Sequence, residues 1–388
     1  MAGWLQSKTG LNWRAAALLG LISSTFSTLV SQFLAARIGR DAVVDWMVVA
    51  TIPFRDGMLQ IEPSWPVIIA GILFHQWADF SWAVVFFGLF GRWTAGLRPR
   101  TILLVALPWA LFTSAAEWFV LVPLIPFWQP IFTLNQPYWI GFLVHAVSAS
   151  MYPLFPWLRD WLGNRLPSPH RRFTAVWSGL AAAGLLVLGI VAFFGWQNRE
   201  PPWMGENPGF DQSYMRRMAA HHGQGVELAQ LAIDKAQDPY LRNLAHLMGA
   251  DQKGEIAMFR QWWRSWFEGD LPPPSPPEHA SMPGMLSAEQ MESLRRTNSA
   301  DFDPLFIALM TTHHQGAVLM ADEALRRAED IRLRLMAHAT RHAQRGEIEL
   351  MHKTQGWQAV KSATRSLFAP AGEVPADRRE QAPSTHRH

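Results

Sequence analysis

Long apolar stretches fill the first half of the chain, and amphipathic helical patterns fill the second half. Five of the stretches approach the roughly 20 residues that a helix needs to cross a bilayer. They are Ala15–Ala36, Pro66–Phe90, Thr101–Val122, Tyr138–Phe155 and Phe173–Trp196. Val43–Pro53 is apolar but short and has charged flanks, so it is expected to be an interfacial or re-entrant segment. The pattern predicts a transmembrane helical domain over residues 1–197.

The second half predicts two helical hairpins, over residues 210–268 and 301–358. Apolar and ligand-type residues recur there at three/four spacing, which places them on one face of each helix. Asp211 and Asp303 each follow a Phe and precede such a segment, as an N-cap would. The dipeptide Asp238-Pro239 marks the turn of the first hairpin.

Proline-rich and polar segments separate these units. Residues 198–209 form a short linker and residues 269–300 a Pro-rich connection that includes Leu271–Pro277. Residues 359–388 are polar and without periodicity, and we expect a disordered tail. Two hairpins of two helices predict a four-helix bundle, whose core is a common place for metal sites.

The two hairpins are copies of one unit. Met218-x-x-His221-His222 returns as Met310-x-x-His313-His314, 92 positions later and without a gap. The same shift superposes Gln252-x-x-Glu255-Ile256 on Gln344-x-x-Glu347-Ile348. Agreement of polar residues over such a span indicates a duplicated supersecondary unit packed about a pseudo-two-fold axis.

Residues of about 210–356 resemble the family catalogued as domain of unknown function 305, which carries the same duplicated Met-x-x-His-His and Gln-x-x-Glu-Ile elements. The resemblance implies a ferritin-like four-helix fold and, because some members are periplasmic copper-binding proteins, a similar role here. The expected fold class is therefore all-α, a five-span transmembrane helical domain followed by a ferritin-like four-helix bundle made of two repeated helical hairpins. The membrane half resembles no family that we recognise.

The residue types point to a transition metal. Eleven of the fourteen His and twelve of the sixteen Met lie after residue 200, and the chain has no Cys, so thiolate is not available as a ligand. Thioether sulfur favours Cu(I), whereas imidazole accepts Cu(I), Cu(II) and Zn. The candidate metal ligands are Met218, His221, His222, Glu255, Met310, His313, His314 and Glu347. Copper is the expected metal, with another transition metal as the alternative.

Helical geometry divides each His pair, because neighbouring residues point about 100° apart. His222 and His314 fit the Met face best, and His221 and His313 are left for a neighbouring site or a helix contact. Glu255 and Glu347 are candidates either for ligation or for holding a His in one tautomer. A metal-free alternative remains, in which the same residues form a hydrogen-bonded core. His246, His338 and His342 are expected on helix surfaces and are minor candidates for ligation.

Several function classes are disfavoured. Di-iron bundles use about four core carboxylates with Glu-x-x-His elements, and the repeat offers one core Glu per copy, so oxidase chemistry and enzyme activity in general are not expected. A sequence pI near 9.4 does not indicate nucleic acid, since the basic residues lie in membrane loops, on helix faces and in the tail. The expected partners are a metal ion and the lipid bilayer, with a second copy or a metal-delivery protein as further candidates.

Basic residues set the expected orientation. Arg92, Arg98 and Arg100 join spans two and three, and no Lys or Arg lies between spans three and four. The positive-inside rule then places the amino terminus in the cytoplasm and, after five crossings, the bundle outside. This topology suggests a multi-pass protein of a bacterial inner membrane with a periplasmic or extracytoplasmic C-terminal domain.

Ionisable residues within the spans are costly and are therefore functional candidates. His75 and Asp79 share a helix face, and Glu117 and His145 lie in the third and fourth spans. They are candidates for an intramembrane proton or metal-ion relay, or for polar contacts that hold helices together. The expected function is a membrane-anchored metal-binding protein in metal tolerance or handling. The alternatives are a metal or ion transporter that uses these four residues, with the bundle as accessory, and a structural or signalling module without metal.

Overall fold

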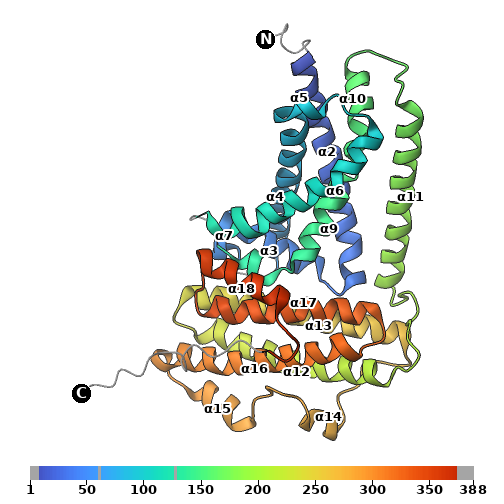
Figure 1. The fold of residues 1–388 in the computed structure, drawn as a ribbon. Helices are drawn as coiled ribbons and strands as arrows, with labels where there is room; N and C mark the ends of the chain where they lie inside the picture. The colour runs from blue at the N-terminus through green and yellow to red at the C-terminus, as the bar shows by residue number, and fades with distance from the viewer. Residues whose placement is uncertain (1–7, 60–62, 126–128, 374–388) are drawn as a thin grey trace.

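The computed structural model describes residues 8–59, 63–125 and 129–373, and these residues form helices and loops without a strand. In Figure 1 a bundle of upright helices stands on a second bundle whose helices lie across it. The first, called the upright bundle, is built from the apolar half of the chain. The second, called the lower bundle, is built from the duplicated half.

Four helices are long and apolar enough to cross a membrane. They span Thr9–Ile38, Trp65–Leu89, Pro99–Leu124 and Arg171–Trp196. They comprise α2 (Lys8–Leu34) with a 3-10 turn η1 (Ala35–Ile38), α4 (Trp65–Val84) with η3 (Val85–Leu89), α6 (Pro99–Ala116) with η4 (Glu117–Leu121) and α7 (Val122–Leu124), and α11 (Arg171–Trp196). Four of the five expected spans are therefore present as single helices.

The fourth expected span, Tyr138–Phe155, is not one continuous helix. Its residues belong to α9 (Tyr138–Ala149), a 3-10 turn η5 (Tyr152–Leu154) and the start of α10 (Phe155–Leu162). Pro153 and Pro156 each lack the N–H that a continuous helix needs, which accounts for the break. Together α9 and α10 still run along the length of α2, with which both make contact. α9 begins near the lower bundle, and Gly163, just after α10, lies beside Leu11 near the start of α2.

The loops rich in Arg gather at the end of the upright bundle away from the duplicated half. Arg159 donates to the carbonyl of Ala95, a residue just after α5 (Gly91–Thr94), and Gly91 lies beside Asn12. The short apolar segment forms α3 (Ala42–Phe54), followed by η2 (Arg55–Leu59), and packs between α4, α8 (Ile131–Asn135) and the lower bundle. As expected, this short segment does not cross the upright bundle from end to end.

The duplicated half is a four-helix bundle. The first hairpin is α12 (Gly209–Lys235) with α13 (Pro239–Trp266), and the second is α16 (Ser299–Arg327) with α17 (Ile331–Met351). The hairpins meet mainly along α12 and α16, while α13 and α17 face the upright bundle. Between them the chain forms α14 (Pro276–Ala280) and α15 (Ala288–Arg296) within the Pro-rich connection.

Asp211 and Asp303 hold the opposite hairpin rather than capping their own helices. Asp211, fully buried inside the first turn of α12, accepts the N–H groups of Glu329 and Asp330 at 3.0 and 2.9 Å. Asp303 accepts those of Gln237 and Asp238 at 3.0 and 2.9 Å. The N-cap expectation for both is wrong, because each helix begins before its Asp. Asp238 does begin α13, and its side chain accepts from the Tyr240 N–H.

The expected tail contains one more helix. α18 (Gly356–Phe368) packs on α17, α7 and α8 and buries Ala359, Val360 and Ala363. The expectation of disorder from residue 359 is wrong for this part, because these small apolar residues recur at helical spacing and find an apolar surface. Residues 374–388 lie outside the described part of the chain.

Candidate metal centre in the duplicated bundle

The duplicated ligand residues meet in the core of the lower bundle. α12 brings in one set of three residues and α16 the other, and all six side chains have zero solvent exposure. They are Met218, His221, His222, Met310, His313 and His314. The four histidine rings form one buried cluster, in which His221 contacts His222 and His313, and His313 contacts His314.

Each repeat makes the same His to Glu contact. His222 Nε2 lies 2.7 Å from Glu255 Oε2, and His314 Nε2 lies 2.6 Å from Glu347 Oε2. Both pairs join residues 33 positions apart, on the two helices of one hairpin. A carboxylate that accepts from Nε2 fixes the tautomer in which Nδ1 carries a lone pair.

The other two histidines stack on each other across the pseudo-two-fold axis. The rings of His221 and His313 lie 3.9 Å apart between centroids with an interplanar angle of 32°. His313 Nε2 is 3.0 Å from the His221 carbonyl, and His221 Nε2 is 3.1 Å from the carbonyl of Pro283 in the connection. Because a carbonyl only accepts, both rings donate through Nε2.

Nδ1 therefore carries a lone pair in His221 and His313 and, while the facing carboxyl is ionised, in His222 and His314. The Nδ1 atoms of His221, His222, His313 and His314 are buried and have no hydrogen-bond partner among the described residues. Buried polar atoms are normally paired, so four orphaned imidazole nitrogens in one core need a partner. A transition metal ion is one partner that such nitrogens can take, and neutral imidazole is the form that ligates.

The electrostatics of the core keep these rings neutral. Burial lowers the pKa of His314 to about 3, and the nearby His222 acts in the same direction. Burial also lowers the pKa values of His221 and His313 far below the usual range, and neighbouring histidines add to the effect. Burial raises the pKa of Glu347 to about 8, with Glu255 contributing in the same direction.

The candidate donors are imidazole nitrogen and thioether sulfur, and they do not form a preformed site of carboxylates and imidazoles. Within the described residues, no group of three or more His, Asp or Glu is arranged to hold one metal ion. Thioether sulfur is the further donor type in this core. Met218 packs in an apolar cluster with Tyr214 and Phe259, and Met310 packs in another with Phe306. Two imidazoles with thioether sulfur fit this core better than a carboxylate site does.

Some residues around the centre were not foreseen. Thr340 Oγ1 donates to Glu255 at 2.9 Å, and its counterpart in the other repeat is Met248. Gln252, fully buried, has neither side-chain atom paired among the described residues. Its oxygen and the His313 ring both lie close to Gly225, where a Cβ would be 1.9 Å from Gln252 Oε1. The conserved spacing could not reveal Thr340, because it occurs in one repeat only.

His338 and His342 lie against the upright bundle and not on a free helix surface. Trp139 Nε1 donates to His338 Nδ1 at 3.3 Å. His342 is 3% exposed, stacks beside Trp118 and has its Nε2 3.3 Å from the Thr133 carbonyl. The surface expectation for His342 is wrong, because α17 turns that face toward α8. His246, which is partly buried, lines a hollow between α13, α12 and α3.

A polar layer joins the two bundles just beyond the metal centre. Asn135 Nδ2 donates to Asp251 Oδ2 at 2.6 Å, next to Glu347 in the centre. Arg40, 4% exposed, pairs with Asp45 at 2.6 Å, and the charges of Asp251 and Glu255 also raise the pKa of its guanidinium, which burial alone would lower. The centre therefore adjoins the interface with the upright bundle.

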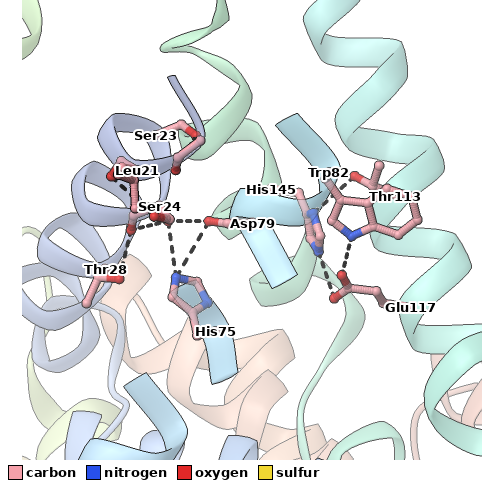
Figure 2. A network of polar contacts seen from close by, with 12 residues as sticks. Leu21, Ser23, Ser24, Thr28, His75, Asp79, Trp82, Thr113, Glu117 and His145 are labelled. Atoms are coloured by element: carbon pink, nitrogen blue, oxygen red, sulfur yellow. Dashed lines mark hydrogen bonds and ion pairs between the residues drawn. The ribbon is translucent and has the colours of Figure 1, made fainter. Parts of the chain in front are cut away.

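The four ionisable residues of the spans form two separate pairs, shown in Figure 2. His75 Nε2 lies 3.6 Å from Asp79 Oδ2, and Ser27 donates to the same carboxylate. His145 Nε2 lies 3.2 Å from Glu117 Oε2, with Thr113 on the other ring nitrogen at 3.0 Å. Trp82 Nε1 also donates to Glu117. His75 thus contacts Asp79 on the same helix, whereas Glu117 pairs with His145 of α9.

Comparison with known proteins covers the duplicated half alone. The family described as "Domain of unknown function (DUF305)" matches residues 211–355. A DUF305 fragment from Deinococcus radiodurans is 27% identical, covering 39% of this chain and 97% of that one, with a TM-score of 0.35. A putative secreted DUF305 protein from Streptomyces coelicolor is 28% identical, covering 37% and 89%, with a TM-score of 0.33.

CopM in its Cu(II)-bound form is 30% identical, covering 37% of this chain and 93% of that chain, with a TM-score of 0.31. CopM has also been solved in Cu(I)-bound and Ag-bound forms. No curated protein matches the chain. Through residues 211–355, this chain belongs to the DUF305 family.

Proposed function

We propose that this protein is a membrane-anchored metal-handling protein whose lower bundle captures copper as cargo. The observation that carries the proposal is the set of four buried Nδ1 atoms without partners, on histidines whose Nε2 atoms are already engaged. His222 and His314, oriented by Glu255 and Glu347, would provide the principal nitrogen ligands. Met218 and Met310 would provide sulfur.

The metal preference follows from the donors. Neutral imidazole with thioether sulfur favours Cu(I) over hard cations. Membership of the DUF305 family, with CopM among the relatives, supports the same metal. Binding and handling, rather than catalysis, suits a closed core in which every ligand residue is buried and the relevant helices are packed on both sides.

The proposed location is a bacterial inner membrane, with the amino terminus in the cytoplasm and the bundle on the periplasmic side. The four apolar helices support membrane insertion. The clustering of Arg-rich loops at the end away from the bundle supports the orientation, since basic loops remain in the cytoplasm. In this position the bundle would capture copper for tolerance or pass it to a partner.

Titration of the purified full-length protein with Cu(I), and with Ag(I) as a redox-inert probe, tests the proposal. The wild type should bind with a defined stoichiometry, and the double variant His222→Ala with His314→Ala should lose that binding. The exposed His279 provides a matched control as His279→Ala, which should bind as the wild type does. Unchanged binding by the double variant would overturn the copper site.

A further inference from the structure

The upright bundle contains a cavity that the copper proposal does not use. It has a volume of about 110 Å³ and lies between α2, α3, α4, α8 and α9. Its wall is mostly apolar, with a few polar side chains converging on it: Ser31, Asp45, His75, Asp79, Glu117, Gln136 and His145. A cavity of this size with polar groups in its wall has room for several water molecules.

The two His and carboxylate pairs lie inside the apolar segments. His75 is ten residues from Trp65, the end of α4 near the lower bundle, which corresponds to about 15 Å at 1.5 Å per residue. His145 lies about 10 Å from the corresponding end of α9 by the same rise. Ionisable groups at this depth are costly unless they serve a function or pair with one another.

Neither pair is sealed from the cavity. Both residues of each pair line the cavity wall, and the Glu117 side chain keeps 22% of its exposure. Asp79 and Glu117 each contact an imidazole, and a His and carboxylate pair of this kind can relay a proton. A pair that only held helices together would not need a cavity beside it.

An aromatic cluster lies beyond the cavity, on the side away from the lower bundle. Phe86 and Phe87 follow Asp79 in η3, and Tyr152 and Phe155 follow His145 along the chain. Phe87 and Phe155 stack at 3.9 Å with an interplanar angle of 8°. All four side chains are at most 6% exposed. This aromatic cluster closes the route toward the opposite end of the upright bundle.

On the other side the cavity reaches the polar layer between the bundles. Asp45 pairs with Arg40 and accepts from Gln136 Nε2 at 2.7 Å. The next residue, Asn135, contacts Asp251 of the lower bundle. Polar groups thus continue from the cavity to the bundle side, whereas aromatic rings block the opposite direction.

We propose that this cavity is a proton half-path, which admits protons from the bundle side to Asp79 and Glu117 and stops at the aromatic cluster. The groups that face the two carboxyls are Ser27, His75 and Tyr152 around Asp79, and Trp82 and His145 around Glu117, with Asp45 and Arg40 at the bundle end. The half-path rests on the membrane placement proposed above and is independent of the copper site.

Infrared difference spectroscopy on the full-length protein in lipid vesicles tests the half-path. Vesicles are selected in which the bundle faces outward, as shown by its protease accessibility. A drop of the outside pH from about pH 7 to about pH 5 should change the bands of the two His and carboxylate pairs, and Asp79→Asn and Glu117→Gln should each remove the change at one pair. Bands that follow the inner pH, or that neither variant removes, would overturn the half-path.

A second measurement does not depend on the folding of the carboxyl variants. Vesicles with wild-type protein should hold an imposed pH difference, because the aromatic cluster blocks passage. The double variant Phe87→Ala with Phe155→Ala should dissipate it faster, whereas the exposed Phe193→Ala control on α11 should not. Equal rates in all three would count against the cluster as the block. Protein that fails to insert into vesicles would instead refute the membrane placement.

Discussion

The ring of His313 lies 3.9 Å from that of His221, although the two residues are 92 positions apart in the chain. Gly225, one turn after His221 on α12, leaves the space that the His313 ring and the Gln252 side chain occupy. The centre therefore depends on a small residue at this position, whose counterpart in the second repeat is Ala317.

Gly225→Ala should weaken copper binding and destabilise the bundle by about 1–3 kcal/mol, because overpacking a dense core costs that much. The new Cβ would lie 2.8 Å from His313 Cε1 and closer still to Gln252. Gly223→Ala is the control, since nothing lies within 4 Å of a Cβ there and Ala favours the helix. Equal copper affinities for the two variants, measured by titration, would contradict the packing argument.

Glu255→Gln and Glu347→Gln should each lower copper affinity by about 10–100-fold without abolishing binding, as expected for a group that orients a ligand. The amide can still contact His222 or His314, but it no longer stabilises the Nε2 proton by charge. Competition with a calibrated Cu(I) chelator measures the change. Complete loss of binding in either variant would indicate direct ligation by the carboxylate.

Asp211→Ala should destabilise the bundle by about 1–3 kcal/mol, because it leaves two buried N–H groups of the opposite turn without an acceptor. Asp303→Ala should cost less, since Asp303 is only partly buried. Thermal unfolding of both variants, followed by circular dichroism, gives the order. If Asp303→Ala destabilised the bundle more than Asp211→Ala, the burial of the Asp would not determine how much each contact stabilises the bundle.

Acidification should destabilise the wild type partly through His342. Burial lowers the pKa of His342 to about 3, and the charges of Arg40 and Arg345 act in the same direction. The unfolded chain, with a pKa near 6.5, therefore binds a proton between about pH 6.5 and pH 3 that the folded state does not bind. Stability falls with falling pH in this window, by about 1.4 kcal/mol per pH unit for one such group.

His342→Gln should remove this share of the pH dependence while keeping a donor toward the Thr133 carbonyl. Denaturant unfolding of wild type and variant at several pH values gives the difference in slope. A variant whose stability falls as steeply as that of the wild type below about pH 6.5 would show that His342 does not carry the effect.

Gly346→Ala should loosen the contact between the two bundles. A Cβ at Gly346 would lie 1.8 Å from the backbone oxygen of Leu134 in α8, which cannot move aside as a side chain does. Gly249→Ala is the matched control, because its nearest neighbour, the Ala229 Cβ, is at an ordinary 3.4 Å. Limited proteolysis at the linker should be faster in Gly346→Ala only. If Gly346→Ala were cleaved at the same rate as the wild type, the contact of Gly346 with Leu134 would not be what holds the two bundles together.

The repeat made much of the bundle predictable. A constant shift identified both hairpins and made Glu255 and Glu347 candidates for holding a histidine. Which histidine each Glu contacts, His222 for Glu255 and His314 for Glu347, became clear only from the structure. Stacking of His221 on His313 was not predictable, since it depends on how two separate helices approach. The order of apolar stretches likewise gave four spans, and Pro153 marked the place where the remaining one breaks.

The interface between the bundles escaped prediction for a physical reason. A polar helix face looks the same whether it meets water or a second polar surface, so His342, Asp251 and Arg40 carried no sign that they are buried. Asp211 was assigned to the wrong partner on similar grounds, because an acidic residue near a helix start suits a cap and a long-range acceptor equally.

The reciprocal contacts of Asp211 and Asp303 have a bearing on how the bundle arose. Each hairpin carries both halves of the contact, an acceptor near its start and a turn with two free N–H groups. Two identical hairpins could therefore satisfy each other about a two-fold axis without any covalent link. A symmetric dimer of the ancestral unit would have brought together two separate hairpins, and the Pro-rich connection joins them in one chain. Once joined, the two copies could change independently, as they have at Thr340 and Gly225.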